Sequence, residues 1–308
     1  MDRYGSLGFR GIHPLASGLY FALWAVMLTL GFHLGIAAAA FLAAVLLAAV
    51  LGLKSSLRRN AKWYALTILL TAVIHPLLNH RGRTILFYFL DQPITLEAVL
   101  YGLQTAVMIS GVMCLFLSFN EVIHPGRFLY LFSKLSPKAA LLMMMALRFV
   151  PLCAARLRLI GDVQRTRRET PQGASFADRM RRLGARVQIL VTWSLESAVA
   201  TADSMAARGY AIGPRTSYRL YRFGLRDGIF VGISGALFLM CISLWLAGWG
   251  RMDVENGPIW DARDGVVLAG VLAFAAIPIA MEGRERWWWR STSLKSKNSA
   301  SAIRTSRT

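Results

Sequence analysis

The chain has few of the residues that build metal centres or disulfide frameworks. Only 3 of its 308 residues are cysteine and only 5 are histidine. Cys114, Cys153 and Cys241 lie within or beside apolar segments without C-x-x-C spacing, and the histidines show no H-x-x-x-H spacing. The cysteines are therefore interpreted as small buried hydrophobic residues. No metal and no cofactor are expected.

Acidic residues and catalytic motifs are scarce as well. The chain has 16 Asp and Glu against 35 Lys and Arg, which gives a formal net charge of +19. No G-x-x-x-x-G-K-[ST] loop occurs, so the chain is not expected to bind ATP by that route. Ser110, Ser118 and Ser194 have no evident histidine partner, and this disfavours a membrane-embedded enzyme. No catalytic residue is predicted.

Apolar residues are abundant. They make up 56% of the chain, and the mean hydropathy is +0.47, whereas a soluble domain holds about 45–50% apolar residues. A bilayer core needs roughly 20 apolar residues per helix. Because the first two apolar segments adjoin each other, they predict a helical hairpin and not a cleaved signal peptide. Six segments qualify as spans: Leu15–Leu34, Gly35–Leu53, Trp63–Leu78, Thr95–Phe119, Asp227–Gly248 and Gly265–Met281.

The basic residues sort by loop. If the N-terminus is inside, 31 of the 35 Lys and Arg fall in inner segments, and only Arg81, Arg83, Arg251 and Arg263 fall in outer loops. By the positive-inside rule both termini are cytoplasmic. This distribution accounts for the net charge without any nucleic acid. The domains expected are a four-span membrane domain (1–119), a cytosolic domain (120–226), two further spans (227–282) and a basic cytosolic tail (283–308).

Several polar or unusual features interrupt the spans. Pro76 is expected to break the third span near its outer end, and Glu97 and Gln104 should face protein and not lipid. The apolar run within the loop 79–94 is expected to lie in the membrane interface or against a partner, or to form a re-entrant packing element. The tail from Ser291 should be disordered, with anionic lipid as its expected contact.

Two long helical patterns occupy the basic segment between the spans. The first runs over Pro137–Glu169, and the second starts at Ser175 with a capping-box pattern and ends at Gly209, a residue that suits a helix C-cap. Each pattern has one apolar stripe, so the two helices should pack along these stripes and cross. Each also ends in arginine, which the helix dipole alone could explain. Met143, Met144 and Met145 offer a soft apolar surface, for which ordinary core packing is the alternative explanation.

These segments carry a resemblance to a known family. The chain resembles the transmembrane T component of energy-coupling factor (ECF) transporters, the family that includes the cobalt-transport permease CbiQ. The strongest motif is the run from Thr201 to Tyr210, which contains the tripeptide Ala207-Arg208-Gly209. The other segments that carry the resemblance are Pro76–Gly82, Thr84–Phe89, Asn120–Val122 and Met145–Pro151.

The resemblance implies an all-α polytopic membrane scaffold with about six transmembrane helices and two long crossing cytosolic coupling helices. Each helix tip would dock on one of two ABC-type ATPase subunits, and the helices would reorient a membrane-embedded substrate-binding S component. Vitamins and transition-metal ions both remain open as substrates. The first tip, Thr166-Arg167-Arg168, lacks the family's alanine and glycine, so the two ATPases are expected to differ. The implied ATPase-coupling residues are Arg165, Thr166, Arg167, Ala207, Arg208 and Gly209.

Two further expectations complete the sequence-based picture. An S component that reorients needs non-directional contacts, so Phe132, Met143, Met144 and Met145 are predicted to form an apolar platform for it. The alternative function is a self-sufficient permease or channel, which would need a polar row inside the spans. Glu97 and Gln104 are the only support for that row.

Overall fold

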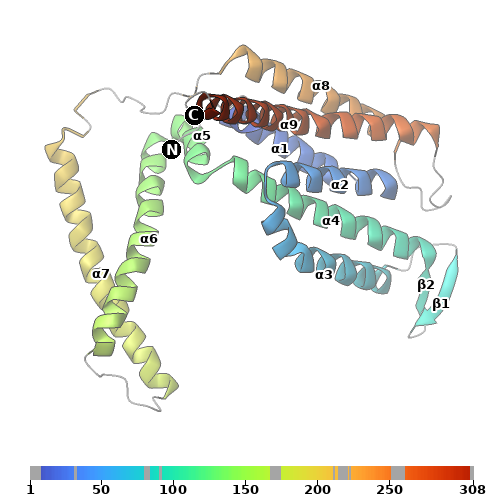
Figure 1. The fold of residues 1–308 in the computed structure, drawn as a ribbon. Coiled ribbons are helices and arrows are strands. Elements are labelled where there is room, and N and C mark those ends of the chain that lie inside the picture. Colours follow the sequence, from blue (N-terminus) through green and yellow to red (C-terminus); the bar gives the residue numbers. More distant parts are fainter. Residues whose placement is uncertain are drawn as a thin grey trace. The chain divides into compact units, whose positions relative to one another are not determined.

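The fold of the chain is described here from a computed structural model. It describes residues 8–30, 33–79, 84–89, 92–166, 175–210, 212–213, 221, 223–250 and 261–305. Within these residues the expected all-α polytopic membrane fold is confirmed, with the addition of one short antiparallel hairpin (Figure 1). The chain divides into two compact units: unit 1 holds residues 1–125 and 221–308, and unit 2 holds residues 126–220.

Six long helices and the hairpin belong to unit 1. Its elements are the 3₁₀ turn η1 (Phe9–Gly11) and helices α1 (Pro14–Thr29), α2 (Leu34–Val50), α3 (Lys54–Leu78), α4 (Leu96–Val122), α8 (Leu225–Leu246) and α9 (Ala262–Thr305), with strands β1 (Ile85–Phe89) and β2 (Gln92–Thr95). Helix α4 packs against α2 and α3, and α9 packs against α2 and α8. Each of the six expected spans therefore corresponds to a helix. The predicted turn between the first two falls where expected, because the His33 side chain caps α2 by accepting from the Gly35 N–H.

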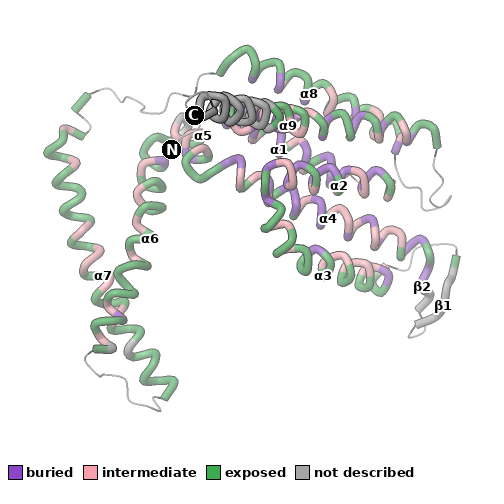
Figure 2. The backbone as a smooth tube through the Cα atoms, viewed as in Figure 1, coloured by how far each residue is buried: buried purple, intermediate pink, exposed green. Residues whose placement is uncertain are grey.

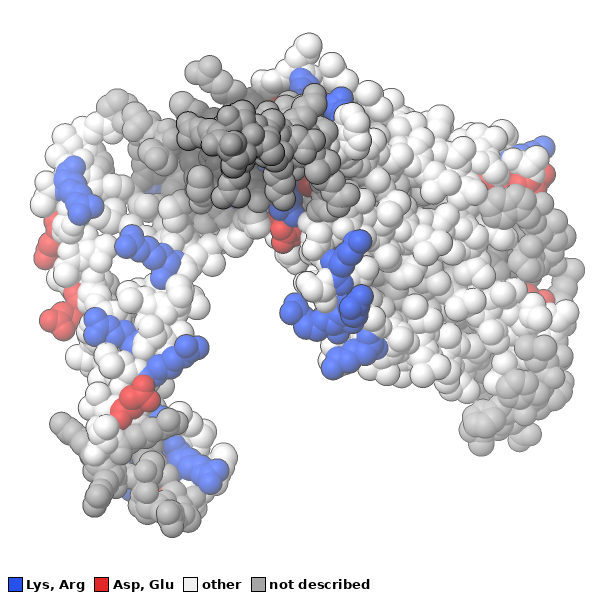
Figure 3. Space-filling model, viewed as in Figure 1, with Lys and Arg blue, Asp and Glu red and all other residues white. Residues whose placement is uncertain are grey.

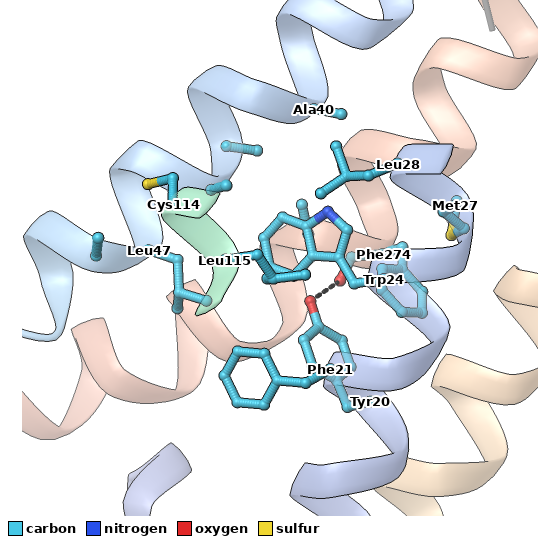
Figure 4. Close-up of a cluster of buried hydrophobic side chains, with 14 of the residues drawn as sticks. Tyr20, Phe21, Trp24, Met27, Leu28, Ala40, Leu47, Cys114, Leu115 and Phe274 are labelled. Carbon is cyan, nitrogen blue, oxygen red and sulfur yellow. Dashed lines mark hydrogen bonds between the residues drawn. The ribbon is translucent and has the colours of Figure 1, made fainter. Parts of the chain in front are cut away.

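Aromatic side chains dominate the core of unit 1. The ring of Tyr20 stacks on that of Phe274, with centroids 4.7 Å apart, and Trp24 meets the same ring edge-on (Figure 4). The Tyr20 hydroxyl donates to the Phe274 backbone carbonyl at 3.1 Å. This carbonyl lies four residues before Pro278, whose nitrogen has no hydrogen to donate to it. The tyrosine therefore satisfies a backbone acceptor that the proline leaves free.

Two boundaries differ from the sequence prediction. Helix α3 starts at Lys54 and continues through Pro76 to Leu78, so the predicted break at this proline is wrong. Pro76 lies in the last turn, where only the carbonyl of Ala72 loses its hydrogen-bond partner. Helix α4 packs closely at this point through Gly102, where an added Cβ would lie 3.4 Å from that carbonyl. The disorder predicted from Ser291 is also wrong, because α9 continues as one helix to Thr305.

The loop between α3 and α4 contains β1 and β2, which the sequence did not predict. The strands pair antiparallel, with Ile85 opposite Thr95 and Phe89 opposite Gln92. Pairing gives the backbone of this apolar segment its hydrogen bonds, as any segment shielded from water requires. The predicted burial of Glu97 and Gln104 is confirmed. Glu97 accepts hydrogen bonds from the Thr84 hydroxyl at 2.6 Å and the Thr84 N–H at 3.2 Å, so it secures the start of the hairpin.

Charged side chains in unit 1 gather at its two ends. Space-filling views show a basic cluster at the start of α3, a charged group near the start of α9, and a broad uncharged surface between them (Figure 3). Five helices are long and apolar enough to cross a membrane, and α1 and α2 are apolar but shorter. The five are α3, α4, α8, the Ala262–Glu285 part of α9 and, in unit 2, Pro137–Gln164 of α6. The uncharged belt is the surface that a multi-pass protein presents to lipid.

Unit 2 consists of α6 (Pro137–Thr166), α7 (Phe176–Ala207) and most of the short helix α5 (Pro125–Leu135). Helices α6 and α7 run antiparallel and cross (Figure 1). At the crossing Trp193 stacks on Phe149, with centroids 6.1 Å apart and planes 7° from parallel, and the guanidinium of Arg156 lies 4.3 Å from the indole centroid. Further along, Arg186 donates to Gln164 at 2.6 Å. The predicted crossing is therefore present.

The apolar stripes do not form this crossing, and this part of the prediction is wrong. Side chains of both stripes remain exposed, and most of α6 and α7 is exposed along its length (Figure 2). The contact uses aromatic and polar side chains instead, and at Gly161 α6 presents only hydrogen toward Arg186. The exposed stripe residues include Leu152, Leu159 and Val163 on α6 and Leu183, Val187 and Val191 on α7.

Trp193 should be the residue on which the crossing depends. We expect Trp193→Ala to weaken the contact by about 1–3 kcal/mol, since it removes one aromatic pair and one cation–π contact. Amide hydrogen exchange along residues 149–166 should then accelerate. Leu195→Ala is the control, because Leu195 is exposed on the same helix. Unchanged exchange in the Trp193 variant would show that other contacts hold the crossing.

Candidate functional site

The C-terminal end of α7 carries the intact Ala207-Arg208-Gly209 tip. Gly209 has a φ of +74°, the left-handed conformation that glycine adopts most readily. Its N–H donates to the Ala206 carbonyl at 3.0 Å, and the Tyr210 N–H donates to the Met205 carbonyl at 3.0 Å. These two bonds define a Schellman motif, which closes a helix by satisfying its last free carbonyls. The predicted C-cap role of Gly209 is confirmed.

The cap determines where Arg208 stands. Arg208 is the C-cap residue, and its side chain is exposed. The turn at Gly209 ends the helix directly after the arginine, so no further helical turn covers it. The glycine and the arginine of the tripeptide therefore have separate physical tasks: one ends the helix, and the other presents five hydrogen-bond donors to the surroundings.

The first tip is built differently. Helix α6 ends at Thr166, whose hydroxyl donates to the Val163 carbonyl at 2.8 Å. This hydroxyl satisfies one carbonyl at the end of α6, as the Schellman motif satisfies carbonyls at the end of α7. Arg165 belongs to the last turn of α6, whereas Arg167 and Arg168 lie outside the described residues.

The antiparallel crossing places the two tips at opposite ends of the helix pair. The crossing pairs Phe149 of α6 with Trp193 of α7, and Gln164 with Arg186. Counted from the Phe149–Trp193 contact, Arg165 lies sixteen residues further along α6 and Arg208 lies fifteen residues further along α7. At 1.5 Å per residue each arm therefore extends about 22–24 Å past this contact. Sequence spacing predicted both helices but not the contact from which the two arms extend.

The start of the α7 helix departs from expectation. Ser175 is the N-cap residue, but its side chain makes no capping hydrogen bond, so the capping box predicted there is not formed. Asp178 in the first turn supplies the negative charge that the helix N-terminus favours.

The predicted platform residues are largely exposed. Phe132 is 48% exposed, Met143 50% and Met144 56%, while Met145 is half-buried. Burial inside a core, the alternative explanation for the methionines, is therefore not their state in this chain. Phe132 lies beside Phe128, one turn earlier on α5, with ring centroids 4.7 Å apart. The first half of α6 exposes further apolar side chains: Leu142, Leu147 and Val150.

The interior of unit 1 offers little to a transported solute. Glu97 is occupied by Thr84 as described above, and the buried Gln104 also has a partner. The hollow lined by Trp24, Met27, Leu28, Ala37, Ala40 and Val271 has a volume of about 10 Å³. This is the space of roughly one water-sized sphere. Among the described residues, no group of three His, Cys, Asp or Glu side chains is placed to hold a metal ion.

A bundle of apolar helices with a separate pair of long crossed helices is the architecture of a multi-pass membrane protein. The family profile described as CbiQ, cobalt transport protein, matches residues 14–218. The chain therefore belongs to the CbiQ family, the transmembrane T components of ECF-type transporters. It is similar to the energy-coupling factor transporter transmembrane protein EcfT of Bacillus selenitireducens, with 29% identity over 190 residues, which cover 57% of this chain and 69% of that protein. Its role is in transport, and it is not itself catalytic.

The geometry of α7 predicts that the change of glycine to alanine has opposite effects on helix stability at Gly209 and at Gly184. Gly209→Ala should destabilise the end of α7 by about 1–2 kcal/mol, the cost of a side chain in the left-handed conformation. Gly184→Ala, in the middle of α7 where an added Cβ meets nothing within 4 Å, should stabilise the helix by about 0.5–1 kcal/mol. Hydrogen exchange at residues 205–210 and 180–188 measures both. Equal effects of the two changes would exclude the strained-turn explanation.

Proposed function

We propose that the chain is the scaffold and coupling subunit of an ECF-type transporter for a micronutrient, either a vitamin or a transition-metal ion. In this proposal two ABC-type ATPase subunits dock on the tips of α6 and α7, and the helices transmit their motion to an S component in the membrane. The observation that carries the proposal is the crossed α6–α7 pair. It has one capped arginine tip and apolar faces that are exposed among the described residues, and the family membership of the chain defines the context.

The arginine tip favours an acidic partner. Arg208 offers a rigid guanidinium fork at the end of an arm about 22 Å long, and this fork suits bidentate pairing with a carboxylate. The ATPase grooves are therefore expected to be acidic. The distribution of Lys and Arg favours a cytoplasmic position for both termini and the tips, the side on which ATP is available.

The apolar faces favour a partner that moves. Removing the exposed Leu, Val and Met side chains of long helices from water, or packing them against another helix, lowers the free energy. This stabilisation depends little on the orientation of the partner. Phe132, Met143 and Met144 are the exposed members of the predicted platform, and Met145 contributes its accessible part. Helix α6 is apolar enough to enter a membrane, which suits a contact with a membrane-embedded S component.

The self-sufficient permease is the second candidate, and the structure supplies little for it. Its two intramembrane polar residues are engaged within the protein, and the enclosed hollow is too small for a solute. Purification of the tagged chain from its native membrane tests both candidates. Co-purification of two P-loop ATPases and a small membrane protein supports the coupling subunit. Transport by the chain alone in liposomes would overturn it.

Charge reversal at the second tip should uncouple the transporter. We expect Arg208→Glu to weaken ATPase binding by roughly 2–5 kcal/mol, since it places like charges in contact, and to abolish uptake. Arg167→Glu should weaken the binding of a different ATPase subunit, because the two tips are built differently. Subunit retention in pull-downs and substrate uptake in proteoliposomes measure the effect.

Arg263→Glu is the control for the tip variants, since Arg263 is an exposed arginine at the start of α9 and does not belong to unit 2. Wild-type ATPase binding and uptake in Arg208→Glu would refute the docking role. Equal loss of one and the same subunit in both tip variants would refute the assignment of one ATPase to each tip.

The platform predicts a specific pattern of crosslinks. Single cysteines at Phe132 and Met144, in a Cys153→Ser background, should give adducts with the S component when a thiol-reactive bifunctional reagent is added to the complex. Leu239→Cys is the control, because Leu239 is exposed on α8 and is not part of the platform. Adducts with the ATPases alone, or no adducts while the complex stays intact, would reject the platform.

A further inference from the structure

The chain passes from unit 1 to unit 2 and back through two junctions. It leaves unit 1 after α4, which ends at Val122, and unit 2 begins at Gly126. It returns at Tyr221, just before α8 begins at Leu225. Any force that unit 2 transmits through the covalent chain must enter unit 1 at these two places. How firmly they are held therefore affects how much of a movement reaches the membrane helices.

The outgoing junction is held by Arg10. Its Nη2 lies 2.9 Å from Glu121 Oε1 in the last turn of α4, and donates to the Leu51 carbonyl at the end of α2 at 2.8 Å. Its Nε lies 3.9 Å from Glu282 Oε1 on α9. Glu282 is buried and the Arg10 side chain is only 28% exposed. One guanidinium therefore joins the ends of α2 and α4 to the middle of α9, in surroundings where ion pairs are less screened than at an open surface.

The returning junction is held by the same segment of the chain. The His13 N–H donates to Asp227 Oδ1 at 3.0 Å, and Asp227 Oδ2 accepts from the Gly224 N–H at 2.9 Å. Arg226 Nη2 donates to the Gly8 carbonyl at 3.2 Å. The His13 ring lies edge-on to Phe223, with centroids 5.5 Å apart, and to Tyr221 at 6.1 Å. These contacts span the four residues that link the end of unit 2 to α8.

The segment that makes these contacts is itself fixed. Phe9 and Ile12 are fully buried, and the Phe9 ring lies between 5.7 and 5.8 Å from the rings of Tyr20, Phe21 and Phe230. His13 also caps α1, because its Nδ1 accepts from the Leu15 N–H at 3.1 Å. Residues 8–13, called the brace below, are thus anchored in the aromatic core and reach both junctions within six residues.

We propose that the brace fixes both junctions in unit 1, so that movement of unit 2 is passed to the membrane helices and not absorbed at the junctions. Arg10 and Asp227 are the positioning residues in this device. They act by holding the end of α4 and the start of α8 within unit 1. The coupling part of this inference rests on the proposed function, whereas the fixing of the junctions does not.

The junctions can be tested on the purified chain alone. Spin labels are attached at His124→Cys and Leu225→Cys, two exposed positions next to the junctions, in a Cys153→Ser background. The distance distribution between the labels, measured by pulsed electron resonance, should be narrow in the otherwise wild-type chain. Arg10→Gln should broaden it, and Arg10→Lys, which keeps the charge but loses the fork, should fall between. Arg263→Gln removes an arginine paired with Asp261 away from both junctions and should leave it unchanged.

The consequence for coupling is measured in the intact complex in proteoliposomes. Arg10→Gln should lower uptake per ATP hydrolysed by roughly ten-fold or more, about the factor expected when one charge-assisted hydrogen bond is lost. ATP hydrolysis per assembled complex should change little. A purely structural role would instead lower uptake and hydrolysis together with the amount of folded complex, and would leave their ratio at the wild-type value.

The two measurements separate two kinds of failure. An unchanged distance distribution in Arg10→Gln overturns the brace, whatever the transport data show. A broadened distribution with an unchanged uptake-to-hydrolysis ratio overturns its role in coupling. If the wild-type chain binds no ATPase, the proposed function fails, but the distance measurement still decides whether the brace holds the junctions.

Discussion

The α6–α7 pair depends on a small contact centred on one indole. Trp193 stacks on Phe149 from one helix, receives the Arg156 guanidinium from the same helix, and leaves the apolar stripes of both helices uncovered. Two helices that packed along their stripes would bury this surface and could offer nothing to a partner. A crossing that uses few residues keeps the faces available. The exposed Leu, Val and Met side chains are thus a result of how the helices cross, and not a defect in their packing.

In unit 1 the constraint concerns polar groups and not apolar faces. In an apolar environment each polar group needs a hydrogen-bond partner. Three buried carboxylates of unit 1, Glu97, Asp227 and Asp264, lie in the first turns of helices, where backbone N–H groups need acceptors. Asp227 accepts from Gly224 and His13, and Asp264 accepts from Gly250 and Asp261. Glu97 does the same for Thr84 at the start of the hairpin. Each acid closes a loop onto a helix, so the charged groups within unit 1 serve its connections and leave the belt between its ends uncharged.

The sequence predicted the helices well because their signals are long. Apolar runs of about 20 residues and a 3.6-residue period are strong patterns, and Gly209 marked the end of α7 correctly. Periodicity shows which residues share a face, but it does not show what covers that face, and so the stripes of α6 and α7 were wrongly paired. Helix α3 continues through Pro76 because this proline lies in its last turn. A helical pattern does not locate the end of a helix to within two or three residues, so it could not show this. The hairpin escaped prediction because Ile85–Phe89 is uniformly apolar and lacks the alternation of a half-buried strand.

The arginines show most clearly why spacing alone could not define the site. Arg10, Arg156 and Arg208 have the same side chain and all belong to the segments predicted to face the cytoplasm. Arg10 joins three helices through two carboxylates and a backbone carbonyl, Arg156 covers an indole in a crossing, and Arg208 is exposed at the helix end, directly before the glycine that caps it. What separates them is the chemistry of residues far away in sequence: Glu121 and Glu282 for the first, and Trp193 for the second. For Arg208 the residue that determines its position, Gly209, is its neighbour in sequence. The tripeptide could therefore be recognised from the sequence, whereas the long-range contacts of the brace could not.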